Sequence, residues 1–322
     1  MKKLTVRFAA AALTVFLLTQ SVSAAQLLIP VGQVIGIEIG EDRVTITGFD
    51  PAIGQAAQDA GLQEGDQITA IDGRQIHCPQ DVQQALQSSD GDVDILITRG
   101  STTKALELEP AITEKGPKLG VYLQQGITGV GTVTYYDPDS QTFGALGHGV
   151  NGKSGELVAM TEGFAYAARV EAVKKGKSGD PGQLMGAVTS CEPIAKLSRT
   201  TVQGIFGKAD IPFKGDALPT ADSSEIRTGP AIIRSTVQNG TVQEYSVEIL
   251  KIYPASSAAG RNMLLQITDP ELLATTGGII QGMSGSPIIQ DGKLVGAVTH
   301  VLVNDPTTGY GIFIENMLDA AA

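Results

Sequence analysis

One serine lies in a loop that suits nucleophilic catalysis. The run Gln281-Gly282-Met283-Ser284-Gly285-Ser286-Pro287 precedes a short apolar strand, and glycines near Ser284 let the backbone turn tightly. Such a turn exposes the hydroxyl and points the amides of Gly282 and Ser284 toward one place, where an oxyanion can form. The loop predicts a nucleophile at Ser284 and an oxyanion hole at Gly282 and Ser284. The alternative is an ordinary turn in a β-protein.

A serine hydroxyl is a weak nucleophile at neutral pH and needs a base, for which histidine has the appropriate pKa. The chain has three histidines. His148 lies in the glycine-rich run Phe143-Gly144-Ala145-Leu146-Gly147-His148-Gly149, which predicts a turn after a strand. His77 belongs to a separate part of the chain, and His300 lies in an apolar strand, where a structural role or a place on the substrate wall is expected. We therefore predict His148 as the base.

A carboxylate that orients the base has four candidates. Asp137, Asp139 and Asp305 lie in Asp-Pro-Asp-Ser and Asn-Asp-Pro, where aspartate usually serves the turn itself. Asp269 follows a predicted strand and precedes Ser284 by 284 − 269 = 15 residues, the length of one loop. We favour Asp269, and the other three stay open.

Composition excludes several classes of protein. The 322 residues are 42% hydrophobic and include 39 glycines, which does not fit a helical bundle, a coiled coil or a disordered chain. The net charge of -11 makes nucleic acid an unsuitable partner. The few histidines and cysteines form no zinc pattern, so we expect no metal and no cofactor.

The first residues have the features of an export signal. Three basic residues precede the apolar run Phe8–Leu18, and small residues follow at Val22-Ser23-Ala24. We predict a signal peptide over residues 1–24, or a membrane anchor if it is not cleaved, and an extracytoplasmic location. Outside the cytoplasm, Cys78 and Cys191 can form a disulfide, although two small buried side chains are the favoured interpretation.

Residues 61–73, Gly-Leu-Gln-Glu-Gly-Asp-Gln-Ile-Thr-Ala-Ile-Asp-Gly, end in a strong hairpin signal. This stretch resembles the PDZ family, and Pro79–Ser88 is the expected second helix. We place a PDZ domain at residues 30–110. Such domains bind a peptide as an added strand beside a helix, which by analogy places the groove at Ile35, Gly36, Ile37 and Leu86. The alternative is that these residues pack internally.

Residues 115–322 contain recurring short apolar runs and few helical periods, which predicts one β-rich unit, a paired barrel or sandwich. Met263–Ile267 is one expected strand, and Ile314–Ala320 is the expected C-terminal helix. The locally basic stretch 174–179, Lys-Lys-Gly-Lys-Ser-Gly, predicts a solvated loop.

The order of a PDZ-like domain, GALGHG, ITDPELL and GMSGSPIIQDGKLVGAVTHVLVNDPTTGYGIFIENML resembles the stage IV sporulation protein B family. The resemblance implies a mainly β fold, in which a small α+β PDZ domain precedes a chymotrypsin-like double β-barrel serine peptidase domain. It also implies a catalytic triad of His148, Asp269 and Ser284.

The same resemblance implies a secreted signalling peptidase in the intermembrane space of the forespore. It is expected to cleave its own chain and the membrane regulatory subunit of an intramembrane protease complex, which then processes a sigma-factor precursor. It would meet the membrane only through its N-terminal segment. One alternative is a non-catalytic PDZ adaptor with a peptidase-like scaffold. Another is a quality-control protease, although that family places PDZ domains after the peptidase.

Overall fold

The computed structural model describes residues 25–76, 79–152, 155–238, 240–257 and 260–322. The predicted leader, residues 1–24, and Cys78 lie outside the described residues, so the expectations for the leader and for a disulfide stay predictions. None of the described helices is both long enough and apolar enough to cross a membrane.

The C-terminal part of the chain forms a closed antiparallel barrel with the strand order β15-β16-β17-β20-β19-β18. Inward-facing aliphatic side chains alternate with exposed ones, as in the burial pattern of β16, because successive side chains of a strand point to opposite faces. The six strands are β15 (Gly229–Ser235), β16 (Gln243–Ile252), β17 (Met263–Ile267), β18 (Pro287–Gln290), β19 (Lys293–Leu302) and β20 (Asp305–Phe313).

Two helices accompany this barrel. Helix α4 (Pro270–Thr276) follows β17, and α5 (Ile314–Ala321) follows β20 and buries Ile314 and Met317. The observed α5 and β17 confirm the predicted helix and strand in these places.

A second barrel forms from the order β9-β10-β13-β12-β11-β2, which the additional pairing of β2 with β9 closes. Its core contains Phe143, Ile205 and Ile35, all with no exposed surface. The strands are β2 (Val34–Phe49), β9 (Val121–Tyr136), β10 (Thr142–Ala145), β11 (Glu162–Lys174), β12 (Gln183–Thr201) and β13 (Gly204–Ala209). The short strands β1 (Leu27–Pro30) and β14 (Leu218–Pro219) extend this sheet beside β9.

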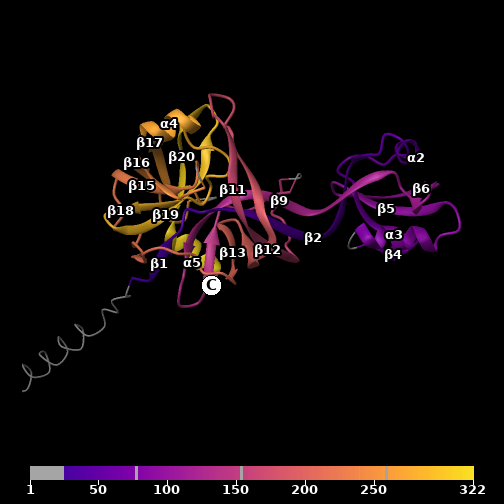
Figure 1. Ribbon diagram of the computed structural model, residues 1–322, viewed down its shortest axis with the longest axis horizontal. Coiled ribbons are helices and arrows are strands. Elements are labelled where there is room, and N and C mark those ends of the chain that lie inside the picture. The colour runs from indigo at the N-terminus through magenta and orange to yellow at the C-terminus, as the bar shows by residue number, and fades with distance from the viewer. Residues whose placement is uncertain (1–24, 77–78, 153–154, 239, 258–259) are drawn as a thin grey trace, which may run out of the picture.

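The PDZ domain is inserted into the N-terminal barrel. Strands β2 and β9 remain paired from Val34 and Thr132 in the barrel to Phe49 and Val121 in the PDZ domain, so they form its stalk (Figure 1). The predicted start of the PDZ domain at residue 30 differs from the structure, because the first part of β2 pairs with β11 of the barrel. The PDZ elements are α2 (Gln55–Asp59), β3 (Gln67–Ile71), β4 (Arg74–Gln75), α3 (Pro79–Ser88), β5 (Val93–Arg99) and β6 (Thr102–Leu108), and the small pair β7 (Ala111–Thr113) and β8 (Gly116–Lys118) follows them.

The sequence signals of the PDZ domain have clear structural causes. Asp72 and Gly73 both have positive φ, 49° and 73°, as a tight hairpin turn between β3 and β4 requires. Asp66 is fully buried, and its carboxylate accepts two hydrogen bonds from Arg99 and one from the Gln63 amide. This pairing satisfies a buried charge that would otherwise be very costly.

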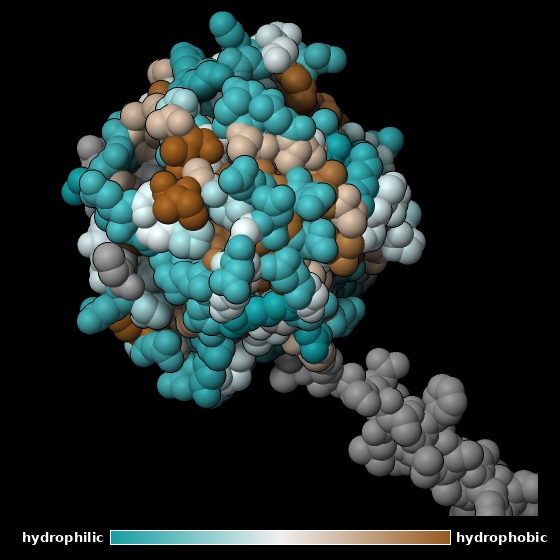
Figure 2. Space-filling view, turned by 90° about the vertical axis from the view of Figure 1, so that its right-hand side faces the viewer, coloured by the Kyte–Doolittle hydropathy of each residue, from teal (hydrophilic) through white to brown (hydrophobic). Residues whose placement is uncertain are grey.

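Two six-stranded barrels and a PDZ domain confirm the predicted fold class, a mainly β chain with a chymotrypsin-like double barrel. Figure 2 views the molecule from the PDZ end, where the surface is mostly hydrophilic and the apolar patches are small and separate. The nucleophile loop lies after α4, and the histidine loop lies after β10, so one loop comes from each barrel.

Candidate active site

The nucleophile loop, residues 281–287, joins α4 to β18. Gly282 and Gly285 both have φ +97°, a conformation that residues with a Cβ rarely adopt. A Cβ at Gly285 would lie 2.0 Å from the Thr132 carbonyl oxygen and 2.6 Å from the Leu146 amide nitrogen. Only glycine therefore lets this loop approach the other barrel so closely.

The amides of Gly282 and Ser284 are available for a ligand. Around them, the amides of Met283, Gly285 and Ser286 each donate to a backbone carbonyl, whereas those of Gly282 and Ser284 have no acceptor among the described residues. The Gln281 carbonyl accepts from Leu184 at 2.8 Å, so the trans peptide directs the Gly282 N–H the opposite way. Two unpaired donors beside one hydroxyl are the arrangement that an oxyanion hole needs.

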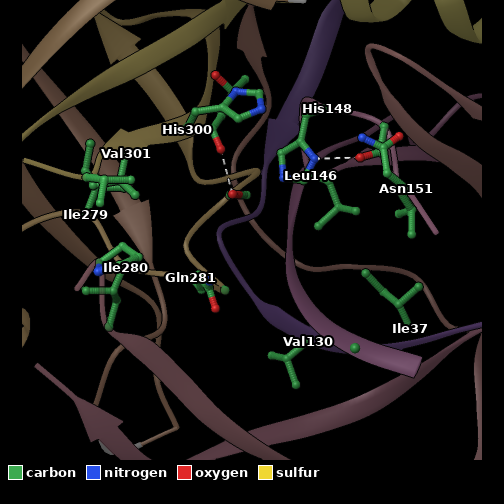
Figure 3. Close-up of a pocket in the computed structure, with 18 of the residues that line it drawn as sticks. Ile37, Val130, Leu146, His148, Asn151, Ile279, Ile280, Gln281, His300 and Val301 are labelled. Carbon is green, nitrogen blue, oxygen red and sulfur yellow. Dashed lines mark hydrogen bonds between the residues drawn. The ribbon is translucent and has the colours of Figure 1, made fainter. Parts of the chain in front are cut away.

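His148 follows a strained turn. Leu146 has φ 70° and Gly147 has φ 69°, and a positive φ at a leucine is uncommon. The His148 Nδ1 lies 2.8 Å from the Gly149 carbonyl oxygen (Figure 3). Since a carbonyl only accepts, Nδ1 carries the proton and Nε2 keeps its lone pair. His148 is thus held in the tautomer that a general base requires.

Ser284 and His148 line the same cavity, but in this structure they are not hydrogen-bonded to each other. The Ser284 hydroxyl donates to the Thr299 carbonyl at 2.7 Å (Figure 3). The His148 ring instead packs beside the His300 ring, with 5.0 Å between their centroids. The structure therefore places the two predicted residues at one cavity. For proton transfer to His148, the Ser284 hydroxyl would have to exchange the Thr299 carbonyl for the imidazole as its acceptor.

Burial sets the protonation of His148. Burial lowers its pKa below the ordinary value of about 6.5, and the bond to the Gly149 carbonyl opposes this shift. A general base must be neutral, so activity is lost as pH falls through this lowered pKa. We expect the acid limb of the reaction with a fluorophosphonate to have its midpoint below pH 6.5, measured as labelling rate between pH 4 and 9. A midpoint above that value contradicts this assignment.

Asp269 occupies another place. It is the N-cap of α4, and its carboxylate accepts from the Leu272 amide at 2.9 Å and the Ser246 amide at 3.3 Å. Among the described residues, no hydrogen bond or ion pair joins it to His148. Asp137 and Asp305 bind the hydroxyls and amides of their own turns, as predicted for them. The orienting role of Asp269 therefore stays a prediction.

Two buried threonines of β9 hold the nucleophile loop and were not identified from the sequence. The Thr132 hydroxyl donates to the Gly282 carbonyl at 2.8 Å, and its amide donates to the Ser284 carbonyl at 3.1 Å. Its own carbonyl accepts from Leu146, next to the histidine. Thr134 donates to the Gly285 carbonyl at 2.8 Å. Thr132 thus connects both catalytic loops across the two barrels.

Thr132→Val is expected to lower kcat about 10- to 100-fold with little change in KM, because the Gly282 carbonyl loses the donor that fixes the oxyanion loop. Thr132→Ser retains the hydroxyl and is expected to restore most of the rate. Steady-state kinetics of the three proteins test this.

Thr236→Val is the matched control, since Thr236 is also buried and donates to a carbonyl across the two barrels, that of Gly32, and neither residue lines the cavity. Both valine variants should lose about 1–3 kcal/mol of stability. An equal loss of kcat in both would show that the effect of Thr132 is only structural.

The basic stretch 174–179 is a largely exposed turn, as predicted, and its backbone also contacts the end of α4. The Gly176 amide donates to the Thr276 carbonyl at 2.7 Å, and Lys175 Nζ donates to the Ala274 carbonyl at 3.0 Å. Gly179 donates to the Val303 carbonyl at 2.9 Å. This turn between β11 and β12 therefore supports the end of α4 and the turn that follows β19.

The predicted PDZ groove at Ile35, Gly36 and Ile37 is wrong. Gly36 pairs with Val130 of β9 on one side and with Tyr166 of β11 on the other, so no strand edge is free there. Ile35 and Ile37 belong to the core of the N-terminal barrel. Leu86 does lie in the PDZ domain, but it is buried in the domain core with 3% exposure.

The strand edge beside α3 belongs to the start of β9. Among the described residues, Val121–Leu123 pair only with β2, and α3 lies against β8 and β9. Just before this edge, Gly120 has φ +71°, and the Leu119 and Gly120 amides have no acceptor among the described residues. The signal in the sequence was the apolar-Gly-apolar run Leu119-Gly120-Val121, which we had assigned to the peptidase domain.

Comparisons with known proteins agree with this organisation. The profile of the SpoIVB peptidase S55 family matches residues 115–318, and a PDZ domain profile matches residues 50–99. No curated protein matches the chain.

Several solved structures show partial similarity. The PDZ domain of the SdrC-like protein from Listeria monocytogenes is 28% identical, with 26% of this chain and 88% of that chain covered and a TM-score of 0.23. The active form of the Rv3671c protease from M. tuberculosis is 15% identical, with 61% and 75% covered and a TM-score of 0.37. The HtrA-type protease AlgW with a decapeptide is 13% identical, with 64% and 56% covered and a TM-score of 0.36.

The family profile covers more than half of the chain, including the loops of His148 and Ser284 and most of the double barrel. The chain therefore belongs to the SpoIVB peptidase S55 family and is a serine peptidase with a PDZ domain.

Proposed function

We propose that this protein is a signalling serine endopeptidase that works through an acyl-enzyme at Ser284. The observation that carries the proposal is the common cavity of Ser284 and His148, beside the unpaired amides of Gly282 and Ser284. A nucleophile, a neutral base and two donors in one place are the components of acyl transfer.

The geometry defines the steps. The Ser284 hydroxyl exchanges the Thr299 carbonyl for Nε2 of His148 and attacks the peptide carbonyl while the imidazole takes its proton. The Gly282 and Ser284 amides stabilise the resulting oxyanion. His148 then returns the proton to the leaving amine, and water releases the acyl group by the same route. In the substrate-free protein the Gly149 carbonyl accepts the Nδ1 proton.

The third member of the proposed triad is Asp269, on the basis of its loop and its spacing from Ser284. Its carboxylate caps α4 in the substrate-free protein. Catalytic hydrogen bonds often form only when substrate binds, so a triad would require Asp269 to leave its cap. Asp269→Asn retains the helix cap but removes the negative charge, so it separates the capping role from the catalytic one.

We further propose an extracytoplasmic enzyme of sporulation, whose substrates are its own chain and a membrane regulatory subunit of an intramembrane protease complex. Cleavage of that subunit would allow the intramembrane protease to process a sigma-factor precursor. Membership of the SpoIVB peptidase family supports this role, and the leader-like residues 1–24 support the location.

The test is to incubate the purified full-length chain alone and with the extracytoplasmic part of the regulatory subunit from the same organism. Mass spectrometry should identify discrete fragments of both proteins, and none with Ser284→Ala. Extensive digestion of unfolded casein, without discrete cleavage of these two substrates, would instead indicate a quality-control protease.

One observation favours a second candidate, the non-catalytic PDZ adaptor. The Ser284 hydroxyl is bonded to the Thr299 carbonyl and not to His148, as in a site that performs no chemistry. An adaptor predicts normal signalling by Ser284→Ala and His148→Ala, whereas a peptidase predicts that both variants fail to signal.

A further inference from the structure

A cavity of about 460 Å³ opens beside Ser284 and His148, between the two barrels (Figure 3). This volume lies in the range of pockets that bind small ligands or side chains. The cavity continues along the end of β19 from Thr299 to Val301 and reaches Val303 in the turn that follows, and the Ile279–Gly282 segment forms another wall. A residue whose carbonyl is attacked by Ser284 has its side chain within a few ångströms of this space.

Aliphatic side chains dominate the walls, and both barrels contribute them. Ile279 and Ile280 are each 1% exposed, so these walls are packed and fixed in place. The aliphatic lining residues are Ile37, Ile39, Val130, Leu146, Val150, Ile279, Ile280, Val301 and Val303.

No aspartate, glutamate, lysine or arginine lines this cavity among the described residues. Its two titratable groups are His148 and His300, and burial lowers the pKa of His300 to about 4. Both imidazoles are therefore neutral near pH 7. Besides His148, the group whose charge acts on His300 is Arg261, and its guanidinium lies over the Tyr310 ring.

His300 adds a polar atom without a partner. Its Nδ1 is buried and is the one buried side-chain nitrogen or oxygen among the described residues that lacks a hydrogen bond. An unpaired buried acceptor is tolerated better than an unpaired N–H, so the proton is placed on Nε2. The wall beside His148 thus offers no charge that would compensate an ionised substrate group.

We propose that this cavity is the subsite for the side chain of the residue whose carbonyl Ser284 attacks, and that it selects apolar side chains. The inference rests on the proposed peptidase function and names the substrate class. A lysine or glutamate side chain would lose its water here without gaining a partner, whereas an apolar side chain would bury against the lining aliphatic residues.

Diphenyl phosphonates of single amino acids test this without knowledge of the natural substrate. Attack by Ser284 forms an Oγ–P bond and breaks a P–O bond, and the proton from the serine leaves with phenol. We would compare labelling rates of the full-length chain with phosphonates that carry leucine, valine, lysine or glutamate side chains. The apolar probes should react at least about tenfold faster than either charged probe.

Val303 provides a charge-swap variant. Its side chain lines the cavity and is 49% exposed, and Gly179 holds its carbonyl, so a polar residue there should not disturb the fold. Val303→Glu should raise the ratio of lysine-probe to leucine-probe rates by about tenfold. Val303→Gln is the matched neutral control and should leave that ratio nearly unchanged.

The outcomes separate the two proposals. A fluorophosphonate without a side chain measures the nucleophile alone. If it labels Ser284 but lysine or glutamate probes react fastest, the apolar subsite is overturned and the peptidase function stands; a glutamate preference would indicate Arg261. If the folded protein reacts with no probe, the subsite and the proposed function both fall.

Discussion

Ser284→Ala is expected to abolish reaction with a fluorophosphonate and to reduce peptide cleavage by about 10⁴-fold or more, because the chain loses the atom that forms the acyl-enzyme. The fold should persist. The hydrogen bond described for this hydroxyl is to the Thr299 carbonyl, so removing the hydroxyl should lower the free energy of unfolding by about 1 kcal/mol. Gel fluorescence after labelling and thermal unfolding of the same samples measure both effects.

Ser235→Ala is the matched control. Ser235 is a fully buried serine of the same barrel, and its hydroxyl accepts from Ser286 of the nucleophile loop, so this variant removes a buried hydroxyl beside that loop and keeps the nucleophile. This variant should be less stable than wild type and should still be labelled. Labelling that persists in Ser284→Ala would show that another nucleophile reacts and would overturn the assignment.

His148→Ala is expected to have the second largest effect, a loss of about 10³-fold or more in the labelling rate. Without the imidazole, no described residue of the cavity except His300 can accept the serine proton. Burial lowers the pKa of His300, and this cause remains in the variant, so His300 is a weaker base than an ordinary imidazole. Rates measured against pH test this, since the acid limb assigned to His148 should vanish together with the activity.

Asp269→Asn is the paired measurement. Asparagine caps a helix about as well as aspartate, so α4 should stay intact while the negative charge is lost. Because the proposed triad needs this charge beside the imidazole, we expect Asp269→Asn to lose about 10²-fold in the labelling rate. Asp269→Ala should lose about 1 kcal/mol from the missing cap.

Activity within about tenfold of wild type in Asp269→Asn would overturn this role. It would show that Asp269 acts only as the cap of α4, where its carboxylate is bound to the Leu272 and Ser246 amides. The unfolding temperature and the labelling rate of the two Asp269 variants, measured together, therefore decide between a capping role and a catalytic one.

The sequence was informative wherever the signal is local. The Asp72-Gly73 turn, helix α3 and strand β17 were predictable because turn residues, a proline in the first turn and an apolar run act over a few positions. The loops of Ser284 and His148 were recognisable for the same reason, since glycines permit the tight turns that both loops require.

The sequence failed where strands had to choose partners. Residues 34–39 have the alternating pattern of any half-buried strand, and this pattern does not say which sheet the strand joins. In the structure, one strand crosses from the barrel into the PDZ domain, so the predicted peptide groove became barrel core. The turn after β11 is exposed as predicted, but its contacts with α4 could not be predicted from the sequence because they join distant parts of the chain.

By itself, the sequence determined the mainly β class, the PDZ module and the two residues best suited to acyl transfer. Only the tertiary structure decided that the PDZ domain is inserted into a barrel, that Asp269 caps a helix and that Thr132 holds the nucleophile loop. The physical reason is the range of the interactions. Thr132 and Gly282 are 150 positions apart, and their hydrogen bond exists only because two closed barrels place β9 against that loop.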